Sequence, residues 1–348
     1  MVLAISDKRV LTQSDLNRAL LARQLLLERS TKSISKVLEA MGGLQAQYAP
    51  SMYIGLWSRI VGFERDNLTR ALERRSVVQG TLLRATIHLV SARDYWPFVA
   101  GITETRKQWW LKTHKVATEK EMTAAARKLR KALGSKTMHR SEIDELLGKP
   151  MAGGIGLWVP MVRVPPSGTW ERRRADLYAA ADEWIAPEKV DPIDGVAHLV
   201  RSYLRGFGPA PIADIASWAG MRPKQIASAL ERLRLRRFQG EDGTELLDVP
   251  RSPLPAADTA APVRFLPTWD ATLLAHARRT GILPERYRAR VFDVKTPHSV
   301  PIFTIDGEVA GTWKLEGDRV KINPFERLSR SVARELRNEA DALTEFHA

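Results

Sequence analysis

The sequence contains no cysteine among its 348 residues. Disulfides, cysteine-bound zinc and thiol catalysis are therefore excluded. Its seven histidines are scattered, and none stands in an HExxH pattern or at another spacing typical of a metal site. We expect no metal and no other cofactor, although the sequence leaves a carboxylate site for magnesium open.

Long apolar runs are missing as well. No stretch approaches the roughly 18 apolar residues that a membrane-spanning helix needs, and residues 1–10 are too short and too polar for a signal peptide. We therefore expect a cytoplasmic protein with no membrane partner. The familiar catalytic motifs are also absent, because the sequence has no GxSxG, no Walker A sequence and no dinucleotide-binding glycine pattern.

Positive charge, by contrast, is abundant and clustered. Lys and Arg total 54 against 40 Asp and Glu, which gives a net charge of +14. Residues 104–140 hold eleven basic and three acidic side chains, residues 222–237 six and one, and residues 278–290 five and one. Most charge runs are solvated helix faces, but an excess gathered in patches is typical of proteins that bind a polyanion. Since no basic amphipathic helix with an aromatic face favours a membrane surface, nucleic acid is the favoured partner.

The order of helix and strand patterns predicts a mainly α protein with small β-hairpins, an α+β class built of tandem winged-helix modules. We place these modules at 1–118, 119–190 and 191–250, followed by a C-terminal α+β region at 251–348. In the first module, short helices precede a predicted strand at 81–90, where apolar and polar residues alternate.

Capping patterns define the elements of the second module. Ser141-x-x-Asp144 is typical of a capping box, and it follows a basic helix predicted at 121–133. A strand at 158–164 and a helix at 176–184 complete this module.

The third module has the clearest pattern. A short helix at 212–218, a glycine stop at Gly220 and a helix at 224–235 with basic N-terminal residues predict a helix-turn-helix. In the C-terminal region, Asp306-Gly307 predicts a two-residue hairpin turn.

One short polar segment has no obvious structural purpose. Gln45 and Gln47 lie two residues apart, directly after the helix stop Gly42-Gly43. In an extended backbone both side chains project to the same side, whereas in a helix they diverge. By itself this segment is best interpreted as a surface loop or a helix start.

Four motifs together resemble the AlkZ-like family of DNA glycosylases. GGLQAQ at 42–47 is similar to the Gln-x-Gln region of that family, and RATIHLV at 84–90 is similar to the strand after its fourth helix. FLPTWD at 265–270 and DGEVAGTW at 306–313 are similar to its C-terminal region. The resemblance covers nearly the whole chain. YcaQ-type members carry Gln-x-Asp where this sequence has Gln-x-Gln, so the resemblance is nearer to the AlkZ type.

The resemblance implies a C-shaped clamp of winged helices around duplex DNA. It also implies a monofunctional DNA glycosylase of base excision repair that removes N7-alkylated purines, with double-stranded DNA carrying alkylated purines as its partner. Processing of interstrand crosslinks stays open. Because no heptad helix or other dimerisation element is evident, we expect a monomer, associated with the nucleoid.

Two neutral amides can suffice for this chemistry. Hydrolysis at an anomeric carbon passes through an oxocarbenium-like state, and an N7-alkylated guanine is already cationic, so its departure needs no added proton. What remains is to orient a water, and glutamine oxygens can accept its hydrogen bonds. We therefore predict that Gln45 and Gln47 are the catalytic residues. No lysine is marked as a Schiff-base nucleophile, so we expect no lyase activity.

Five other residues are candidates for DNA contact. Arg84, Thr86 and His88 are predicted to contact the backbone near the lesion, although a hydrogen-bonded structural role for His88 is equally compatible with the sequence. Arg222 and Lys224 begin a helix, which suits phosphate contacts. In a clamp of several winged helices, however, not every recognition helix has to face DNA.

Three aromatic or acidic residues near these motifs are assigned structural roles. Tyr48 can stack beside a lesion as a wedge, but we favour a place in the core. We also favour structural roles for Trp269 and Asp270.

The competing function is a winged-helix transcription regulator without enzymatic activity. Such regulators usually dimerise to contact two half-sites, and 348 residues are many for a plain repressor. A regulator would select an operator, whereas a repair enzyme would bind random DNA with a steep salt dependence. An RNA-binding or membrane-surface scaffold has no specific sequence feature in its favour.

Overall fold

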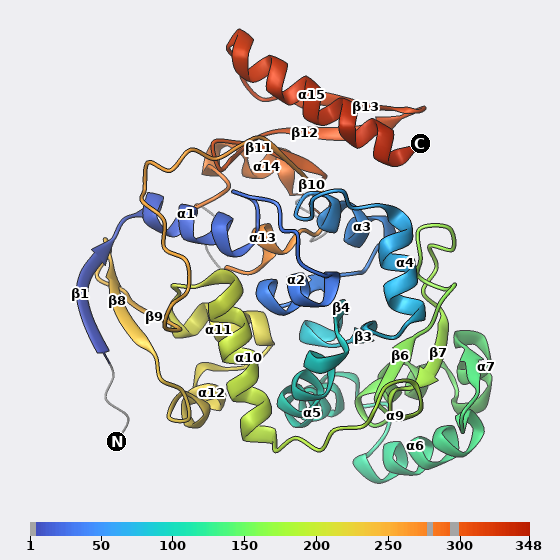
Figure 1. Ribbon diagram of the computed structural model, residues 1–348. Helices are drawn as coiled ribbons and strands as arrows, with labels where there is room; N and C mark the ends of the chain where they lie inside the picture. The colour runs from blue at the N-terminus through green and yellow to red at the C-terminus, as the bar shows by residue number, and fades with distance from the viewer. Residues whose placement is uncertain (1–4, 277–280, 293–298) are drawn as a thin grey trace.

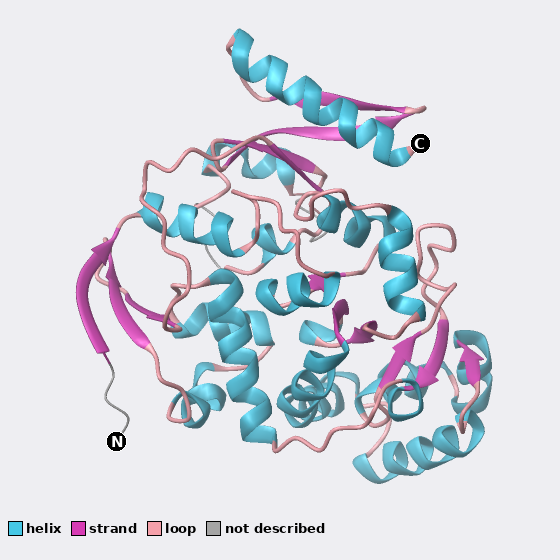
Figure 2. Cartoon of the chain, viewed as in Figure 1, coloured by secondary structure: helices cyan, strands magenta, loops and turns pink. Residues whose placement is uncertain are grey.

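The computed structural model describes residues 5–276, 281–292 and 299–348 (Figure 1). Helices predominate and the strands form small sheets (Figure 2), so the predicted α+β class is confirmed. The clamp of winged helices stays a prediction. Within the described ranges, no helix has the length and apolar character needed to cross a membrane.

The first third of the chain alternates short helices with strands and ends in a long helix. Its elements are β1 (Ile5–Leu11), α1 (Gln13–Arg23), α2 (Ile34–Met41), β2 (Leu44–Gln45), α3 (Ala49–Trp57), α4 (Arg65–Glu73), β3 (Val77–Thr81), β4 (Ile87–Ser91) and α5 (Ala92–His114). Both α1 and α5 begin at side-chain caps, since the hydroxyl oxygens of Thr12 and Ser91 accept the N–H groups of Asp15 and Asp94.

The middle of the chain contributes α6 (Glu119–Leu133), β5 (Thr137–His139), α7 (Arg140–Leu147), α8 (Lys149–Gly154), β6 (Met161–Arg163), β7 (Leu177–Ala180) and α9 (Ala181–Trp184). It continues with α10 (Pro192–Phe207), α11 (Ile212–Ala219), α12 (Pro223–Leu230), β8 (Arg236–Gly240) and β9 (Glu245–Asp248). The predicted helix-turn-helix is present as α11 and α12, because Gly220 ends α11 in the left-handed conformation.

The C-terminal region contains β10 (Arg264–Leu266), α13 (Ala271–Leu274), α14 (Arg288–Val291), β11 (Ile302–Ile305), β12 (Glu308–Glu316), β13 (Arg319–Pro324) and α15 (Arg330–His347). The predicted turn at Asp306-Gly307 joins β11 to β12. Helix α15 lies along β13, at the edge of the molecule that carries the C-terminus (Figure 1).

Three sheets connect parts of the chain that are far apart in sequence. Their strand orders are β2-β4-β3-β6-β7-β5, β10-β11-β12-β13 and β1-β8-β9. We call residues 1–118, 119–190 and 191–250 the first, second and third segments. The six-stranded sheet takes strands from the first and second segments, and β1 pairs in parallel with β8 of the third segment. The module boundaries stay predictions, and the sheets pair strands across them.

The prediction of a single strand over 81–90 is wrong. The chain reverses there, because β3 ends at Thr81 and β4 begins at Ile87, with a short 3-10 turn, η1 (Leu83–Ala85), between them. Arg84 and Ala85 have φ angles of 50° and 59°. Neither is a residue type that favours the left-handed region, so the sequence carries no turn signal at this place.

Three predictions in the second segment also differ from the structure. The cap of α7 is His139 with Glu142 as its capping-box partner, so the box predicted at Ser141 lies two residues too late. The helix predicted at 176–184 begins only at Ala181 as α9, because residues 177–180 form strand β7, which pairs with β5 and β6. The strand predicted at 158–164 is shortened to β6. At 177–180, pairing with the distant strands β5 and β6 overrides the local pattern.

Close approach of two helices joins the first and third segments. A Cβ atom added at Gly195 of α10 would lie 2.5 Å from the backbone nitrogen of Gly101 in α5, and one at Gly101 would lie 2.8 Å from the carbonyl carbon of Gly195. Only glycine allows this backbone contact. It fixes α10 against the helix that follows β4.

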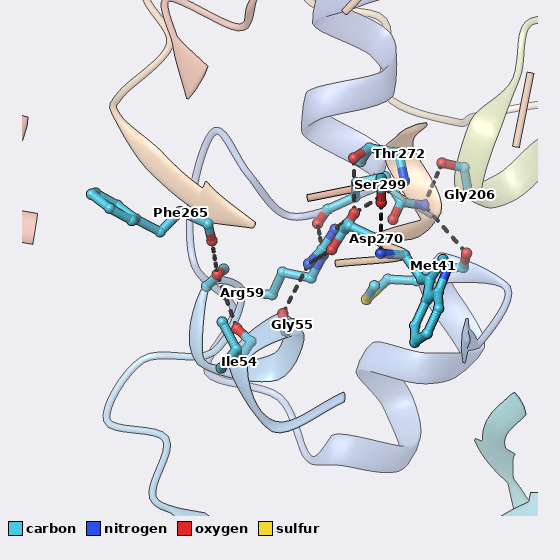
Figure 3. A network of polar contacts seen from close by, with 12 residues as sticks. Met41, Ile54, Gly55, Arg59, Gly206, Phe265, Asp270, Thr272 and Ser299 are labelled. Atoms are coloured by element: carbon cyan, nitrogen blue, oxygen red, sulfur yellow. Dashed lines mark hydrogen bonds and ion pairs between the residues drawn. The ribbon is translucent and has the colours of Figure 1, made fainter. Parts of the chain in front are cut away.

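A buried ion pair joins the first segment to the C-terminal region (Figure 3). Arg59 donates from Nη2 and Nη1 to the two carboxylate oxygens of Asp270 at 2.8 and 2.9 Å, and both side chains are fully buried. Arg59 also donates to the carbonyl oxygens of Gly55 and Gln24, and Asp270 accepts the N–H and hydroxyl of Thr272. All the strong polar groups of the pair are thus satisfied. The structural role expected for Asp270 is confirmed.

We predict that Asp270→Asn lowers the free energy of unfolding by about 3–5 kcal/mol, because it leaves the buried Arg59 guanidinium without a counter-ion. Urea denaturation followed by circular dichroism measures the loss. As a matched control, Glu245→Gln removes the exposed partner of Arg237 and is expected to cost less than about 1 kcal/mol. Equal losses for the two variants would contradict the role assigned to the pair.

Candidate functional site

The segment that carries the two glutamines is placed by Gly42 and Gly43. Both have positive φ, 78° and 83°, and Gly42 ends α2 in the left-handed conformation. A Cβ at Gly43 would lie 2.9 Å from the Val90 side chain and 3.0 Å from the carbonyl oxygen of Leu89. The glycine pair therefore turns the chain out of α2 and lays it directly against β4.

Strand β2 then pairs antiparallel with β4, at the edge of the six-stranded sheet. Its register places Leu44 opposite Leu89 and Gln45 opposite His88. Gln45 is half-buried. Its side chain makes no hydrogen bond with any residue in the described ranges, so its amide is available to a ligand.

Gln47 continues this ladder with its side chain. The N–H of Ala46 donates to the carbonyl oxygen of Ile87 at 2.7 Å, and the N–H of Ile87 donates to Oε1 of Gln47 at 3.1 Å. Ala46 is buried in the core, whereas Gln47 is exposed. The structure therefore holds both glutamines at one sheet edge, but the oxygen of Gln47 is already an acceptor for a backbone N–H.

A small recess, which we call the Gln45 recess, opens beside this edge. It is lined by Gly42, Gly43, Gln45, Arg84, His88, Trp218, Ala271, Leu274 and Ala275. Its volume of about 10 Å³ is at the lower limit of the space that one water molecule occupies. No Asp or Glu of the described chain is part of this lining. Any catalysis by the residues of the recess therefore has to use neutral or cationic groups.

His88 is buried beside Gln45, with an exposed fraction of 3%. Burial, together with the positive charges of Arg84 and Arg106, lowers the pKa of its imidazole to about 3. Its Nδ1 lies 3.1 Å from the carbonyl oxygen of Thr86, which can only accept a hydrogen bond. His88 is therefore neutral at physiological pH, with the proton on Nδ1 and Nε2 as an acceptor.

Arg84 connects the hairpin turn to the third segment. Its Nη1 donates to the carbonyl oxygen of Trp218 at 2.7 Å, and burial lowers the pKa of its guanidinium. A Cβ at Gly220 would lie 3.5 Å from the backbone nitrogen of Arg84, so the α11–α12 turn packs on the hairpin turn. Thr86 is half-buried, and its hydroxyl donates to the carbonyl oxygen of Leu83.

The two basic candidates of the helix-turn-helix are exposed. Arg222 is the N-cap of α12, and its N–H donates to Oε1 of Gln225 at 2.8 Å. Lys224 lies in the first turn of the same helix. Neither lines the Gln45 recess.

The assignment of Tyr48 to the core is wrong. Its side chain is 41% exposed, and its hydroxyl accepts a hydrogen bond from Arg173 at 3.2 Å. Tyr48 precedes the first residue of α3, so the chain leaves the sheet edge before the core begins.

Sequence reasoning missed the residues that close the recess from the far side. Trp218 and the segment Ala271–Ala275 reach it from parts of the chain more than 170 positions beyond Gln45. Only the FLPTWD motif, directly before Ala271, pointed toward them. In the described ranges, no group of three His, Asp or Glu side chains is placed to hold a metal ion.

Comparisons with known proteins agree on one family. The family described as DNA glycosylase AlkZ-like matches residues 38–346. An interstrand DNA cross-link repair glycosylase of Streptomyces sahachiroi is 21% identical over 91% of this chain and 92% of its own. The solved structure of the Streptomyces sahachiroi DNA glycosylase AlkZ superposes with a TM-score of 0.84 at 17% identity, over 97% of each chain. At that identity, the superposition shows the shared fold.

We predict that His88 makes the protein less stable in acid. The unfolded chain takes up a proton on His88 at its ordinary pKa of 6.5, but the folded protein does so only near pH 3. Between these values the unfolded state binds more protons, so the free energy of unfolding falls as pH falls, by at most about 1.4 kcal/mol per pH unit. His88→Asn lacks this titration and should show a shallower pH dependence in urea denaturation between pH 4 and 7. Parallel curves for the two proteins would refute the assignment.

Proposed function

The chain belongs to the AlkZ-like DNA glycosylase family, and from this premise we propose that it hydrolyses the N-glycosidic bond of cationic N7-alkylated purines in duplex DNA. The observation that carries the proposal is the register of β2 and β4. It sets the unpartnered amide of Gln45 beside the neutral imidazole of His88, in a recess with no acidic lining among the described residues. Family membership favours this function over that of a transcription regulator.

In the proposed reaction a water attacks C1′ of the lesion nucleotide and the bond from C1′ to the purine breaks. The bonding pair goes to the cationic base, which leaves neutral, and the water loses a proton to solvent. The side-chain oxygen of Gln45 accepts a hydrogen bond from the water and orients it. Gln47, whose oxygen already accepts the N–H of Ile87, offers its remaining acceptor position and fixes the edge at which the water sits.

The neutral state of His88 avoids a further positive charge beside a cationic transition state. A protonated histidine next to the sugar would oppose the positive charge that develops on C1′, and the low pKa of His88 keeps its ring neutral. A site with so weak a base acts only where the leaving group is already activated. We therefore propose labile, cationic lesions as the substrates, and not intact purines.

Crosslinks that join two strands through purine N7 atoms present the same leaving group. The Streptomyces sahachiroi relative is described as an interstrand DNA cross-link repair glycosylase, which supports this substrate class as a second one. In the same complex, the exposed Arg222 and Lys224 at the start of α12 would contact phosphates, together with the Arg84–Thr86 turn. We propose that the enzyme acts as a monomer.

We predict that replacing both Gln45 and Gln47 by Ala lowers release of 7-methylguanine from duplex DNA by roughly 100-fold or more, because water is no longer oriented. Affinity for undamaged duplex should change little. Free base is measured by chromatography and binding by fluorescence anisotropy. Gln239→Ala, which removes an exposed amide from β8, is the matched control and should keep full activity. Unchanged release by the double variant would end the proposal.

We also predict that the enzyme leaves the DNA strand intact. No amine nucleophile is placed in the recess among the described residues, so no Schiff base forms and no β-elimination follows. A labelled duplex with one 7-methylguanine should run at full length after reaction and break only after alkali. Borohydride trapping should give no covalent complex, and a trapped complex would contradict the proposal.

A further inference from the structure

A second and larger cavity lies at the same hairpin turn, at the junction with the second segment. Its volume is about 180 Å³, and it is bounded by α5, β6 and the α8–η2 segment, with η2 at Ile155–Leu157. Thr81 and Ala85 of the turn belong to its lining. The remaining chemistry of the lining is aromatic and basic: Trp109, Trp110, Tyr178, Arg106, Arg140 and Arg163. No carboxylate of the described chain faces it.

Two of these arginines are buried and converge on consecutive residues. Arg106 is 3% exposed and donates from Nη1 to the carbonyl oxygen of Leu82 at 3.1 Å. Arg163 is 7% exposed and donates from Nη2 to the hydroxyl of Thr81 at 3.1 Å. Both guanidinium groups therefore bind the end of β3, and both line the same cavity. We call this cavity the Arg106–Arg163 pocket.

Each of the two guanidinium groups has a buried nitrogen that lacks a partner. Within the described ranges, Nη2 of Arg106 and Nη1 of Arg163 make no hydrogen bond, and neither side chain forms an ion pair. The other buried arginines each have a carboxylate partner. Arg23 and Arg59 hold theirs with two bonds each, whereas Arg18 pairs with Asp306 and Arg264 with Glu339. Burying a cation without a counter-ion costs desolvation free energy. An anion bound in this pocket would offset that cost.

The aromatic rings hold both groups in position. The Arg106 guanidinium lies 5.3 Å from the centre of the Trp109 ring, and that of Arg163 lies 5.1 Å from the centre of the Tyr178 ring. Trp109 is 47% exposed and forms an open rim. Burial lowers the pKa of Arg106 to about 10, which leaves the group charged at neutral pH. Planar guanidinium groups with free N–H donors match the oxygens of a phosphate.

We propose that the Arg106–Arg163 pocket binds a phosphate group of the duplex DNA that the enzyme acts on. The proposal rests on the proposed function, since it deepens the way in which that DNA is held. The pocket and the Gln45 recess share one turn: Ala85 lines the pocket, whereas Arg84 lines the recess. A phosphate held at Arg106 and Arg163 would fix the strand relative to Gln45.

The first test uses inorganic phosphate and the intact protein. At constant ionic strength, phosphate in place of chloride should give a saturable rise in Tm, on the order of 4 °C at one hundred times Kd, and a saturable change in tryptophan fluorescence. Arg106→Gln and Arg163→Gln should lose this response. Arg127→Gln, which removes an exposed arginine of α6 that does not line the pocket, should keep it. A wild-type protein without a saturable response would overturn the proposal, whether or not the variants fold.

The second test identifies the source of the phosphate. Undamaged duplex DNA should compete with phosphate for the fluorescence response. The dependence of duplex affinity on salt should become shallower by about 0.9 in log–log slope for each lost contact in Arg106→Gln or Arg163→Gln, but not in Arg127→Gln. Phosphate binding that duplex DNA leaves unchanged would assign the pocket to a free phosphate and refute the DNA contact. Neither test measures base release, so failure of the proposed catalysis is detected separately, by the glutamine variants.

Discussion

The carboxylate of Asp270 and the guanidinium of Arg59 meet in the interior, and the placement of the site depends on their contact. The pair fixes α3 against the C-terminal region, and Arg59 also holds the carbonyl oxygen of Gln24. The Gln24 side chain in turn donates to the carbonyl oxygens of Met41 and Gly206 at 3.3 and 2.9 Å. Both Met41 and Gly206 are labelled in Figure 3. Met41 directly precedes the two glycines that deliver Gln45 to β4. A continuous set of hydrogen-bonded groups therefore connects the C-terminal region to the start of the Gln45–Gln47 segment.

The buried arginines differ in whether a carboxylate neutralises their positive charge. Arg59 and Arg23, which join distant segments, are saturated by carboxylates and by backbone oxygens. Arg106 and Arg163, which converge on the β3–β4 turn, each keep an unpaired nitrogen. Saturated pairs add specificity to the packing and offer nothing to a ligand. Unsaturated ones create a positive potential at one place, which suits a polyanionic partner. The net charge of +14 alone would not distinguish the two.

Gln45 and His88 of the recess are both uncharged, although the guanidinium of Arg84 also belongs to its lining. Gln45 carries no charge, and the imidazole of His88 has lost its proton because burial and two neighbouring arginines disfavour the charged form. Such a site cannot protonate a leaving group. In the proposed reaction the substrate therefore has to bring its own activation.

Local chemistry in the sequence determined the α+β class, the caps of α1 and α5, the glycine stop before Gln45, the helix-turn-helix and the Asp306-Gly307 hairpin, because each depends on residues within a few positions. The family resemblance pointed to Gln45 and Gln47, which composition alone could not have separated from a surface loop. Only the tertiary structure decided that β4 begins after a left-handed turn at Arg84, that β1 pairs with β8, that Tyr48 lies outside the core, and that Arg106 and Arg163 line one cavity. These outcomes come from contacts between segments tens to hundreds of positions apart, whose free energies exceed local preferences and leave no periodic trace in the sequence.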